Sequence, residues 1–266
     1  MPTKKSPRRE WPMDSYCSAW KVFRRLSNEN EETAKHLIDQ SAWPSKDGIV
    51  LCDIGCGDGR LVESIVLRCQ KAIGEIRLLD PDLEMLNQAE TVVTETGFID
   101  RIRTRLGVAE NDLAEVIEGA DVAIMVHVVY LMQPGALEST LAACPSRVPL
   151  YVVLDEPNSI FTELWARTAP AFYERSLNAH RLLEALALSS DYMSRRSTIR
   201  SQIGSPLRLK RAELRDAILS IFCYADITGL GLMNLRAWIE SVVAEHSNPD
   251  GNVVCESACY ELVRRP

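Results

Sequence analysis

Short apolar runs alternate with amphipathic helical patterns through the middle of the chain. Uninterrupted apolar runs rich in β-branched residues are typical of strands that are buried on both faces. Ile49, Val50, Leu51 and Ile54 form such a run, and strands are predicted at residues 49–54, 75–80, 101–107, 121–126 and 148–155. Apolar residues with helical spacing lie between them, at 58–69, 82–95, 110–118 and 135–143. This alternation predicts an α/β fold built on a doubly wound, parallel sheet.

The pattern changes on either side of this α/β core. Tyr16, Trp20 and Phe23 have the i, i+4, i+7 spacing of an amphipathic helix, and a second short helix follows. Past Glu156 the chain is mainly helical. Helices are predicted near 159–167, 178–188, 211–222 and 231–246, with strands near 197–203 and 253–263. We therefore expect three parts: a tail and helical lid (1–44), an α/β core (45–158), and a helical substrate-binding region with the closing strands (159–266).

A glycine-rich turn follows the first predicted strand. Gly55, Gly57 and Gly59 occupy alternate positions, and glycine lets the backbone turn tightly and approach a ligand closely. Asp80 ends the second predicted strand, 21 residues after Gly59. In dinucleotide-binding folds a glycine turn makes room for the ligand, and such an acid accepts hydrogen bonds from ribose hydroxyls. An ordinary strand-to-helix turn and an NAD site are the alternative interpretations.

The spacing of this turn resembles motif I of the Rossmann-like methyltransferases that use S-adenosylmethionine (SAM). Asp-x-Gly-x-Gly-x-Gly differs from the Gly-x-Gly-x-x-Gly of NAD-binding folds. The resemblance implies that SAM is the cofactor, that no metal takes part, and that Asp53 orients the amino-acid end of SAM. Asp80 would then bind the ribose. The implied cofactor-binding residues are Asp53, Gly55, Gly57, Gly59, Asp80, Pro81, Val126 and, over the adenine, Val108 and Ala109.

A narrower resemblance, to the histamine N-methyltransferase family, covers most of the chain. Tyr16-x-x-x-Trp20-x-x-Phe23-x-x-x-Ser27-x-Glu29 resembles the opening of that family. Residues 125–131, 154–172 and 256–260 resemble its fourth-strand segment, the stretch after its fifth strand, and its final strand. The resemblance implies that Glu29 receives the substrate amine and that Tyr16 and Tyr130 are aromatic walls.

Three positions of the implied acceptor pocket depart from this family. His127 stands where the family has a glutamine, Glu256 where it has an asparagine, and Leu131 replaces a tyrosine. These departures leave the identity of the amine open. We expect His127 to act as the base because an imidazole titrates near neutral pH, with Glu29 and Glu256 as the other catalytic candidates. The implied substrate-binding residues are Tyr16, Trp20, Glu29, His127, Tyr130, Trp165 and Glu256.

The predicted function is methyl transfer from SAM to a small aromatic or heteroaromatic amine. The methylated atom could be a nitrogen or an electron-rich ring carbon, such as that of an indole. A methyltransferase acting on RNA or protein, and a SAM-binding protein without this activity, are the alternatives. Each acceptor residue also has a simpler interpretation. Glu29 can stabilise a helix start, Glu256 can face solvent, and His127 and the two tryptophans can belong to the core.

Charge and composition narrow the range of partners. The 266-residue chain has a formal net charge of −7, and its basic cluster lies in the first ten residues, which disfavours an extended nucleic-acid surface. The eight cysteines include no Cys-x-x-Cys pair, which fits free thiols in a reducing compartment. No signal peptide and no 18-residue apolar run is present. We expect a soluble, cytoplasmic monomer or homodimer that does not bind membranes.

Overall fold

The computed structural model describes residues 20, 22–69, 72–97, 101–133, 135–224 and 233–266. Tyr16 lies outside these residues, and the aromatic wall predicted there stays a prediction. Residue 20 and residues 22–26 are helical, as the aromatic spacing predicts. Among the described helices, none is long and apolar enough to span a membrane.

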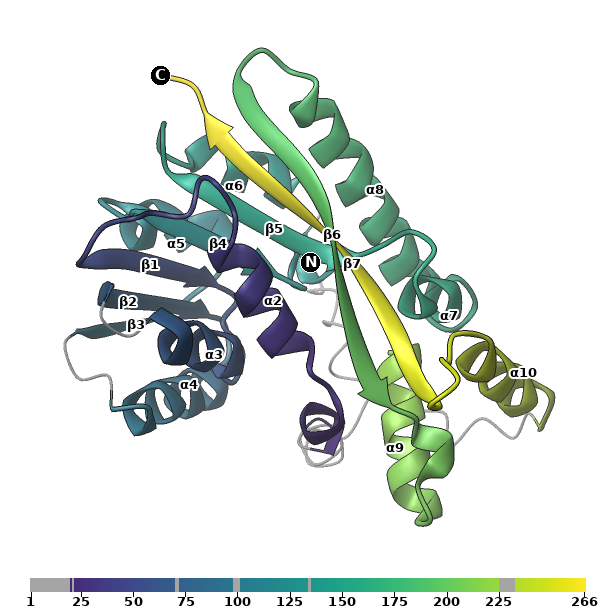
Figure 1. Ribbon diagram of the computed structural model, residues 1–266. Helices are drawn as coiled ribbons and strands as arrows, with labels where there is room; N and C mark the ends of the chain where they lie inside the picture. The colour runs from purple at the N-terminus through teal and green to yellow at the C-terminus, as the bar shows by residue number, and fades with distance from the viewer. Residues whose placement is uncertain (1–19, 21, 70–71, 98–100, 134, 225–232) are drawn as a thin grey trace, which may run out of the picture. The chain divides into compact units, whose positions relative to one another are not determined.

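The strands form one mixed sheet with the order β3-β2-β1-β4-β5-β7-β6 (Figure 1). Strands β1 to β5 pair in parallel, and β7 pairs antiparallel with β5. This sheet confirms the predicted α/β class. The strands are β1 (Ile49–Ile54), β2 (Ile73–Asp80), β3 (Ile102–Leu106), β4 (Val122–Val126), β5 (Pro149–Asp155), β6 (Tyr192–Gly204) and β7 (Asn252–Arg264).

The helices lie close to the predicted positions, with one longer than expected. Helix α8 begins at Pro170, eight residues before the predicted start. A helix can begin at a proline, because the N–H that proline lacks would have no partner within the first turn. The helices are α2 (Glu29–Ile38), α3 (Arg60–Cys69), α4 (Leu83–Glu95), α5 (Ala109–Ile117), α6 (Ala136–Ala143), α7 (Ile160–Thr168), α8 (Pro170–Ala187), α9 (Ala212–Cys223) and α10 (Met233–Glu245).

The chain divides into two compact units, each made of separate segments. The sheet unit comprises residues 30–155, 175–199 and 257–266, and it contains β1 to β5. The helical unit comprises residues 1–29, 156–174 and 200–256, and it contains α7, α9 and α10. Strands β6 and β7 contribute residues to both units.

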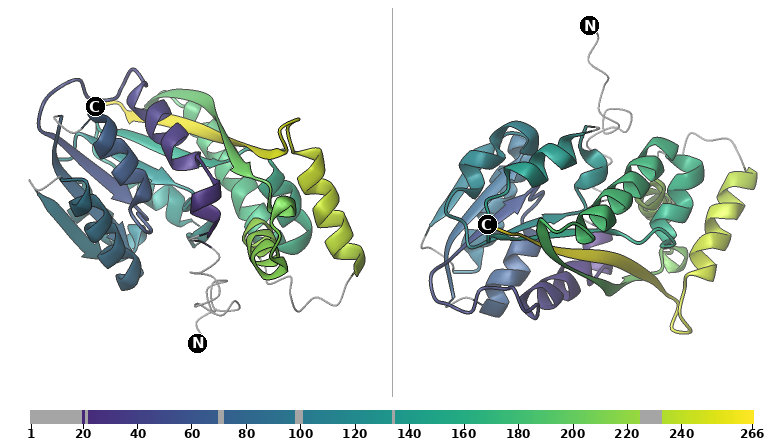
Figure 2. Two further views of the ribbon diagram at one scale, coloured as in Figure 1. Left: turned by 60° about the horizontal axis from the view of Figure 1, so that its bottom comes forward. Right: turned by 90° about the horizontal axis from the view of Figure 1, so that it is seen from above.

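The core of the sheet unit is built from alternate residues of its strands. Ile49 and Leu51 of β1 are fully buried and belong to one hydrophobic cluster with residues of α2, α3 and α4. These three helices lie against one face of the sheet, with α5 and α6 on the other (Figures 1 and 2). Ala34 and Leu37 of α2 are fully buried in this cluster. Helix α2 is therefore a core helix of the sheet unit, and the lid predicted for residues 1–44 stays a prediction.

Aromatic residues form the core of the helical unit. Trp165 packs edge-on against Phe172 at a centroid distance of 5.8 Å, and Phe172 stacks on Tyr224 at 3.8 Å. Phe222 makes edge contacts with both Phe161 and Phe23. The buried Trp165 thus has the core role that its helical spacing allows.

Candidate functional site

All three glycines of the turn after β1 have backbone conformations that favour glycine. Their φ angles are 76° at Gly55, 55° at Gly57 and 77° at Gly59. A Cβ at Gly55 would collide with Val128, and one at Gly59 would lie 2.6 Å from the Cα of Ala89. A Cβ at Gly57 would meet no atom within 4 Å. Two of the glycines therefore allow close packing, while Gly57 leaves open space beside the turn.

Asp80, at the carboxyl end of β2, is held in place by backbone amides. Its Oδ2 accepts a hydrogen bond from the Gly57 amide at 2.9 Å, and its Oδ1 accepts one from the Asp82 amide at 2.9 Å. The residue is 4% exposed. Each carboxylate oxygen has two lone pairs, so these bonds fix the side chain and still allow it to accept from hydroxyl groups of a ligand. Asp80 and the turn therefore fit the ribose side of SAM.

Asp53, near the end of β1, is a second buried acid beside the turn. Burial, together with a smaller contribution from the neighbouring Asp80 carboxylate, raises the pKa of its carboxyl group to about 8. A cation placed near Asp53 would favour its ionised form and lower this pKa. The amino-acid end of SAM carries an ammonium group, so the charge environment of Asp53 fits that part of the cofactor.

Three exposed apolar side chains belong to segments that lie next to Asp80. The Gly107 amide donates to the Asp80 carbonyl at 3.1 Å, which places the residues on either side of Gly107 beside β2. Those residues, Leu106 and Val108, are 53% and 37% exposed, and Leu83 at the start of α4 is 56% exposed. Large exposed apolar side chains next to a ligand site suit contact with a flat ring such as adenine. Leu83 and Leu106 were missed in the sequence analysis, although each lies at the end of an element beside the predicted site.

His127 follows β4 with a strained backbone. Its φ is 56°, a left-handed value that is uncommon for residues other than glycine, and its amide donates to the Val153 carbonyl of β5 at 2.8 Å. Such conformations cluster at functional sites, where surrounding contacts hold them.

The side chain of His127 belongs to a hydrogen-bonded group with Tyr130 and Asp155. His127 Nδ1 lies 2.8 Å from the Tyr130 hydroxyl, which donates to Asp155 Oδ2 at 3.2 Å. His127 Nδ1 is also 3.4 Å from Asp155 Oδ2. Because the single hydroxyl proton of Tyr130 points to Asp155, its oxygen accepts from an Nδ1–H of His127. The basic nitrogen of the neutral imidazole is then Nε2.

Asp155 ends β5 and is fixed through its backbone as well. Its carbonyl oxygen lies 2.8 Å from His180 Nε2, and His180 Nδ1 lies 2.9 Å from the Tyr260 hydroxyl. His180 and Tyr260 are both buried. The sequence analysis missed Asp155, although an acid at the carboxyl end of a predicted parallel strand is the signal that identified Asp80.

The two predicted catalytic glutamates are paired with arginines. The carboxylate of Glu29 lies 3.7 Å from the Arg24 guanidinium, whose carbon is 4.5 Å from the ring centre of Trp20. Glu256 accepts from Arg200 Nε at 2.7 Å, and its side chain is one-third exposed. These five residues belong to the helical unit, as does Trp165, whereas His127 and Tyr130 come together in the sheet unit. The roles predicted for Trp20, Glu29, Trp165 and Glu256 stay predictions.

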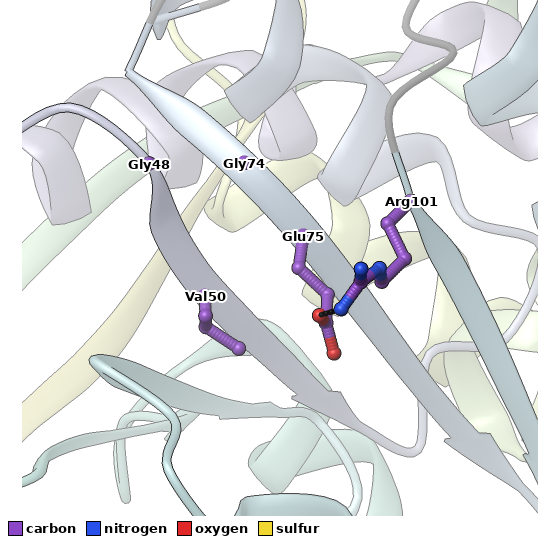
Figure 3. Close-up of a pocket in the computed structure, with 5 residues that line it drawn as sticks. All are labelled: Gly48, Val50, Gly74, Glu75 and Arg101. Carbon is purple, nitrogen blue, oxygen red and sulfur yellow. Dashed lines mark hydrogen bonds and ion pairs between the residues drawn. The ribbon is translucent and has the colours of Figure 1, made fainter.

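A cavity of about 360 Å³ lies at the opposite end of the strands (Figure 3). Gly48, Val50, Gly74, Glu75 and Arg101, at the amino ends of β1 and β2 and the start of β3, line it. The Glu75 carboxylate accepts from Arg77 at 2.7 Å and from Arg101 at 3.0 Å. Burial opposes ionisation of Glu75, but these hydrogen bonds lower its pKa overall. Ion pairing accounts for this cluster, which is separate from the glycine turn.

The chain is similar in structure to solved methyltransferases. The plantazolicin methyltransferase BamL, in complex with a triazolic desmethylPZN analog and S-adenosylhomocysteine (SAH), is 15% identical with a TM-score of 0.54, covering 95% of this chain and 91% of BamL. A SAM-dependent methyltransferase from Thiobacillus denitrificans in complex with SAH is 12% identical with a TM-score of 0.53, covering 96% and 100%. The YcgJ protein from Bacillus subtilis is 12% identical with a TM-score of 0.52, covering 90% and 98%.

These similarities establish the fold, which is the Rossmann-like fold of SAM methyltransferases. No family model matches the sequence, and no curated protein matches it. The narrower resemblance to the histamine N-methyltransferase family is not tested by these structures and stays a prediction. Within the described ranges, no group of three or more His, Cys, Asp and Glu residues is arranged to hold a metal ion.

Proposed function

We propose that the chain is a SAM-dependent methyltransferase. The observation that carries this proposal is the glycine turn, whose Gly57 amide is bonded to Asp80 at the carboxyl ends of β1 and β2. Ligands of open α/β sheets bind at this edge. When bound, SAM supplies a methyl group that moves to the acceptor by in-line displacement, so the protein contributes mainly positioning and control of the acceptor's proton.

Each part of SAM has a matching residue beside the turn. Asp80 binds the ribose hydroxyls, and Asp53 faces the ammonium group of the amino-acid end. Leu83, Leu106 and Val108 contact the adenine through their exposed apolar surfaces. The fold shared with methyltransferases that were crystallised with SAH supports this assignment over an NAD site.

Calorimetric titration of the full chain with SAM, SAH and NAD tests the cofactor assignment. We expect SAM and SAH to bind without added metal, and NAD to bind much more weakly. Asp80→Ala removes a charged hydrogen-bond acceptor and should weaken SAH binding by about 1–3 kcal/mol. Glu213→Gln, at an exposed carboxylate of α9, is the matched control and should leave the affinity unchanged. Preference for NAD would refute the proposal, and unchanged affinity in Asp80→Ala would remove Asp80 from the site.

The proposed acceptor is a small aromatic or heteroaromatic amine, methylated at a nitrogen or at an electron-rich ring carbon. The resemblance to the histamine N-methyltransferase family and the position of His127 support this class. His127 Nε2 takes up the proton that the acceptor atom loses as its lone pair, or its ring electrons, bond to the methyl carbon. Tyr130 and Asp155 hold the ring in the tautomer that leaves Nε2 basic. BamL was crystallised with a triazolic desmethylPZN analog, so an acceptor screen should extend from arylalkylamines to azole-containing amines.

A further inference from the structure

One oxygen of the buried Asp155 carboxylate has no hydrogen-bond partner among the described residues. Oδ2 accepts from Tyr130 at 3.2 Å, whereas Oδ1 is buried and accepts from no described group. The residue is 3% exposed. Burying an acceptor without a partner costs free energy, and the cost is larger for a charged group. Such an atom at the ligand-binding edge of a sheet is a reason to look for a donor that the chain itself does not supply.

The Asp155 carboxylate also has no lysine or arginine partner among the described residues. Within the described part of the chain, no lysine or arginine forms an ion pair with Asp155, and its side-chain neighbours are a tyrosine hydroxyl and the imidazole of His127. A buried carboxylate is normally paired with a cation. Glu29 and Glu256, by contrast, each have an arginine partner.

The position of Asp155 is set by contacts on both its backbone and its side chain. His180 holds the carbonyl oxygen, Tyr260 holds His180, and Arg196 Nε donates to the Tyr260 hydroxyl at 3.3 Å. Tyr130 and His127 hold the side chain from the β4 side. A carboxylate held in this way loses little conformational entropy when it binds a ligand, which favours selective recognition.

We propose that Asp155 Oδ1 binds a cationic N–H group of the acceptor: an ammonium, amidinium or guanidinium. This inference rests on the proposed function and assigns to Asp155 the cation recognition that the sequence analysis predicted for Glu29 and Glu256. The cationic group is distinct from the methylated atom, which must carry an electron pair. Neutral analogues of the acceptor leave the carboxylate buried without a counter-charge, and a site of this kind rejects them strongly.

Matched amine and alcohol pairs test this assignment. Tryptamine, tryptophol, 2-phenylethylamine and 2-phenylethanol are titrated calorimetrically into the full chain saturated with SAH. We expect at least one amine to bind and its alcohol to bind at least tenfold more weakly. Asp155→Asn should weaken amine binding about 10- to 100-fold, which is the usual effect of losing a charged hydrogen bond, and bring the amine-to-alcohol ratio close to one. Tyr130→Phe keeps the carboxylate and should retain the preference for the amine.

The rival carboxylates are tested in the same experiment through Glu29→Gln and Glu256→Gln. Loss of amine preference in either of these variants, with retention in Asp155→Asn, would overturn the proposal. It would also be overturned if wild type bound no amine or bound the alcohols equally well. SAH affinity is the separate readout for the proposed function. The SAH affinity should be unchanged in Asp155→Asn. If Asp155→Asn binds no SAH and is therefore unfolded, Asp155→Ser replaces it. Failure of wild type to bind SAH would refute both proposals.

Discussion

Asp53 should make the stability of the protein depend on pH, and Asp53→Asn should remove that dependence. Burial and the neighbouring Asp80 carboxylate raise the pKa of Asp53 to about 8 in the folded chain, whereas an aspartate in an unfolded chain titrates at about 3.9. Between these values the folded state holds one proton more than the unfolded state. The stability that this proton contributes is complete below the lower pKa and is lost as the pH rises through the higher one.

The size of the effect follows from linkage. While the folded state holds one extra proton, each unit rise in pH lowers the free energy of unfolding by about 1.4 kcal/mol, which amounts to about 2.7 kcal/mol between pH 5 and pH 7. Asparagine at position 53 keeps the shape of the side chain and does not titrate. Asp53→Asn should therefore gain stability relative to wild type as the pH rises over this window.

Guanidinium unfolding at pH 5, 6 and 7 measures this difference, because all other titrating groups are common to both proteins. Glu213→Gln is the control: its carboxylate is exposed, so its difference from wild type should not change with pH. Calorimetry provides an independent measure. If the ammonium of SAM ionises Asp53, SAM binding at pH 7 should release close to one proton, detected by comparing buffers of different ionisation enthalpy. Equal pH slopes for Asp53→Asn and wild type, together with no proton release, would refute the reasoning.

Three further substitutions test the turn, the core and the base. Gly59→Ala should destabilise the fold and weaken SAH binding, because φ is 77° and an added Cβ meets the backbone of α4. Gly119→Ala is the control, because φ is 70° there but the space is open. In denaturation experiments it should cost only the roughly 1–2 kcal/mol of the left-handed conformation. Leu37→Ala should lower the free energy of unfolding by about 2–5 kcal/mol, because the side chain is fully buried. Its control is Leu188→Ala, which removes a side chain that is 90% exposed and should change the free energy of unfolding by less than about 0.5 kcal/mol. His127→Ala should reduce methyl transfer to arylalkylamines, followed by mass spectrometry, by about 10²–10⁴-fold without changing SAH affinity. Full activity in this variant would exclude His127 as the base.

Local patterns in the sequence were sufficient to identify the elements of the sheet unit and the glycine turn after β1. The strands from β1 to β5 and the helices between them lie within a few residues of their predicted bounds, because apolar strand patterns and helical periodicity are properties of consecutive residues. The glycines of the turn could be recognised for the same reason. Their positive φ angles are local requirements that few other residues satisfy.

The partners of the acidic side chains were decided only by the tertiary structure. Pairing of Val126 with Val153 brings the end of β4 beside the end of β5, and so places His127 and Tyr130 at Asp155, a residue more than twenty positions away in the chain. Glu29 and Glu256 instead lie beside arginines, and α2 packs into the core of the sheet unit. The residue types and their spacing indicate which side chains are acidic or apolar. Which of them share a buried environment depends on strand register and helix packing between distant segments, and that environment determines the charge state and chemistry of each group.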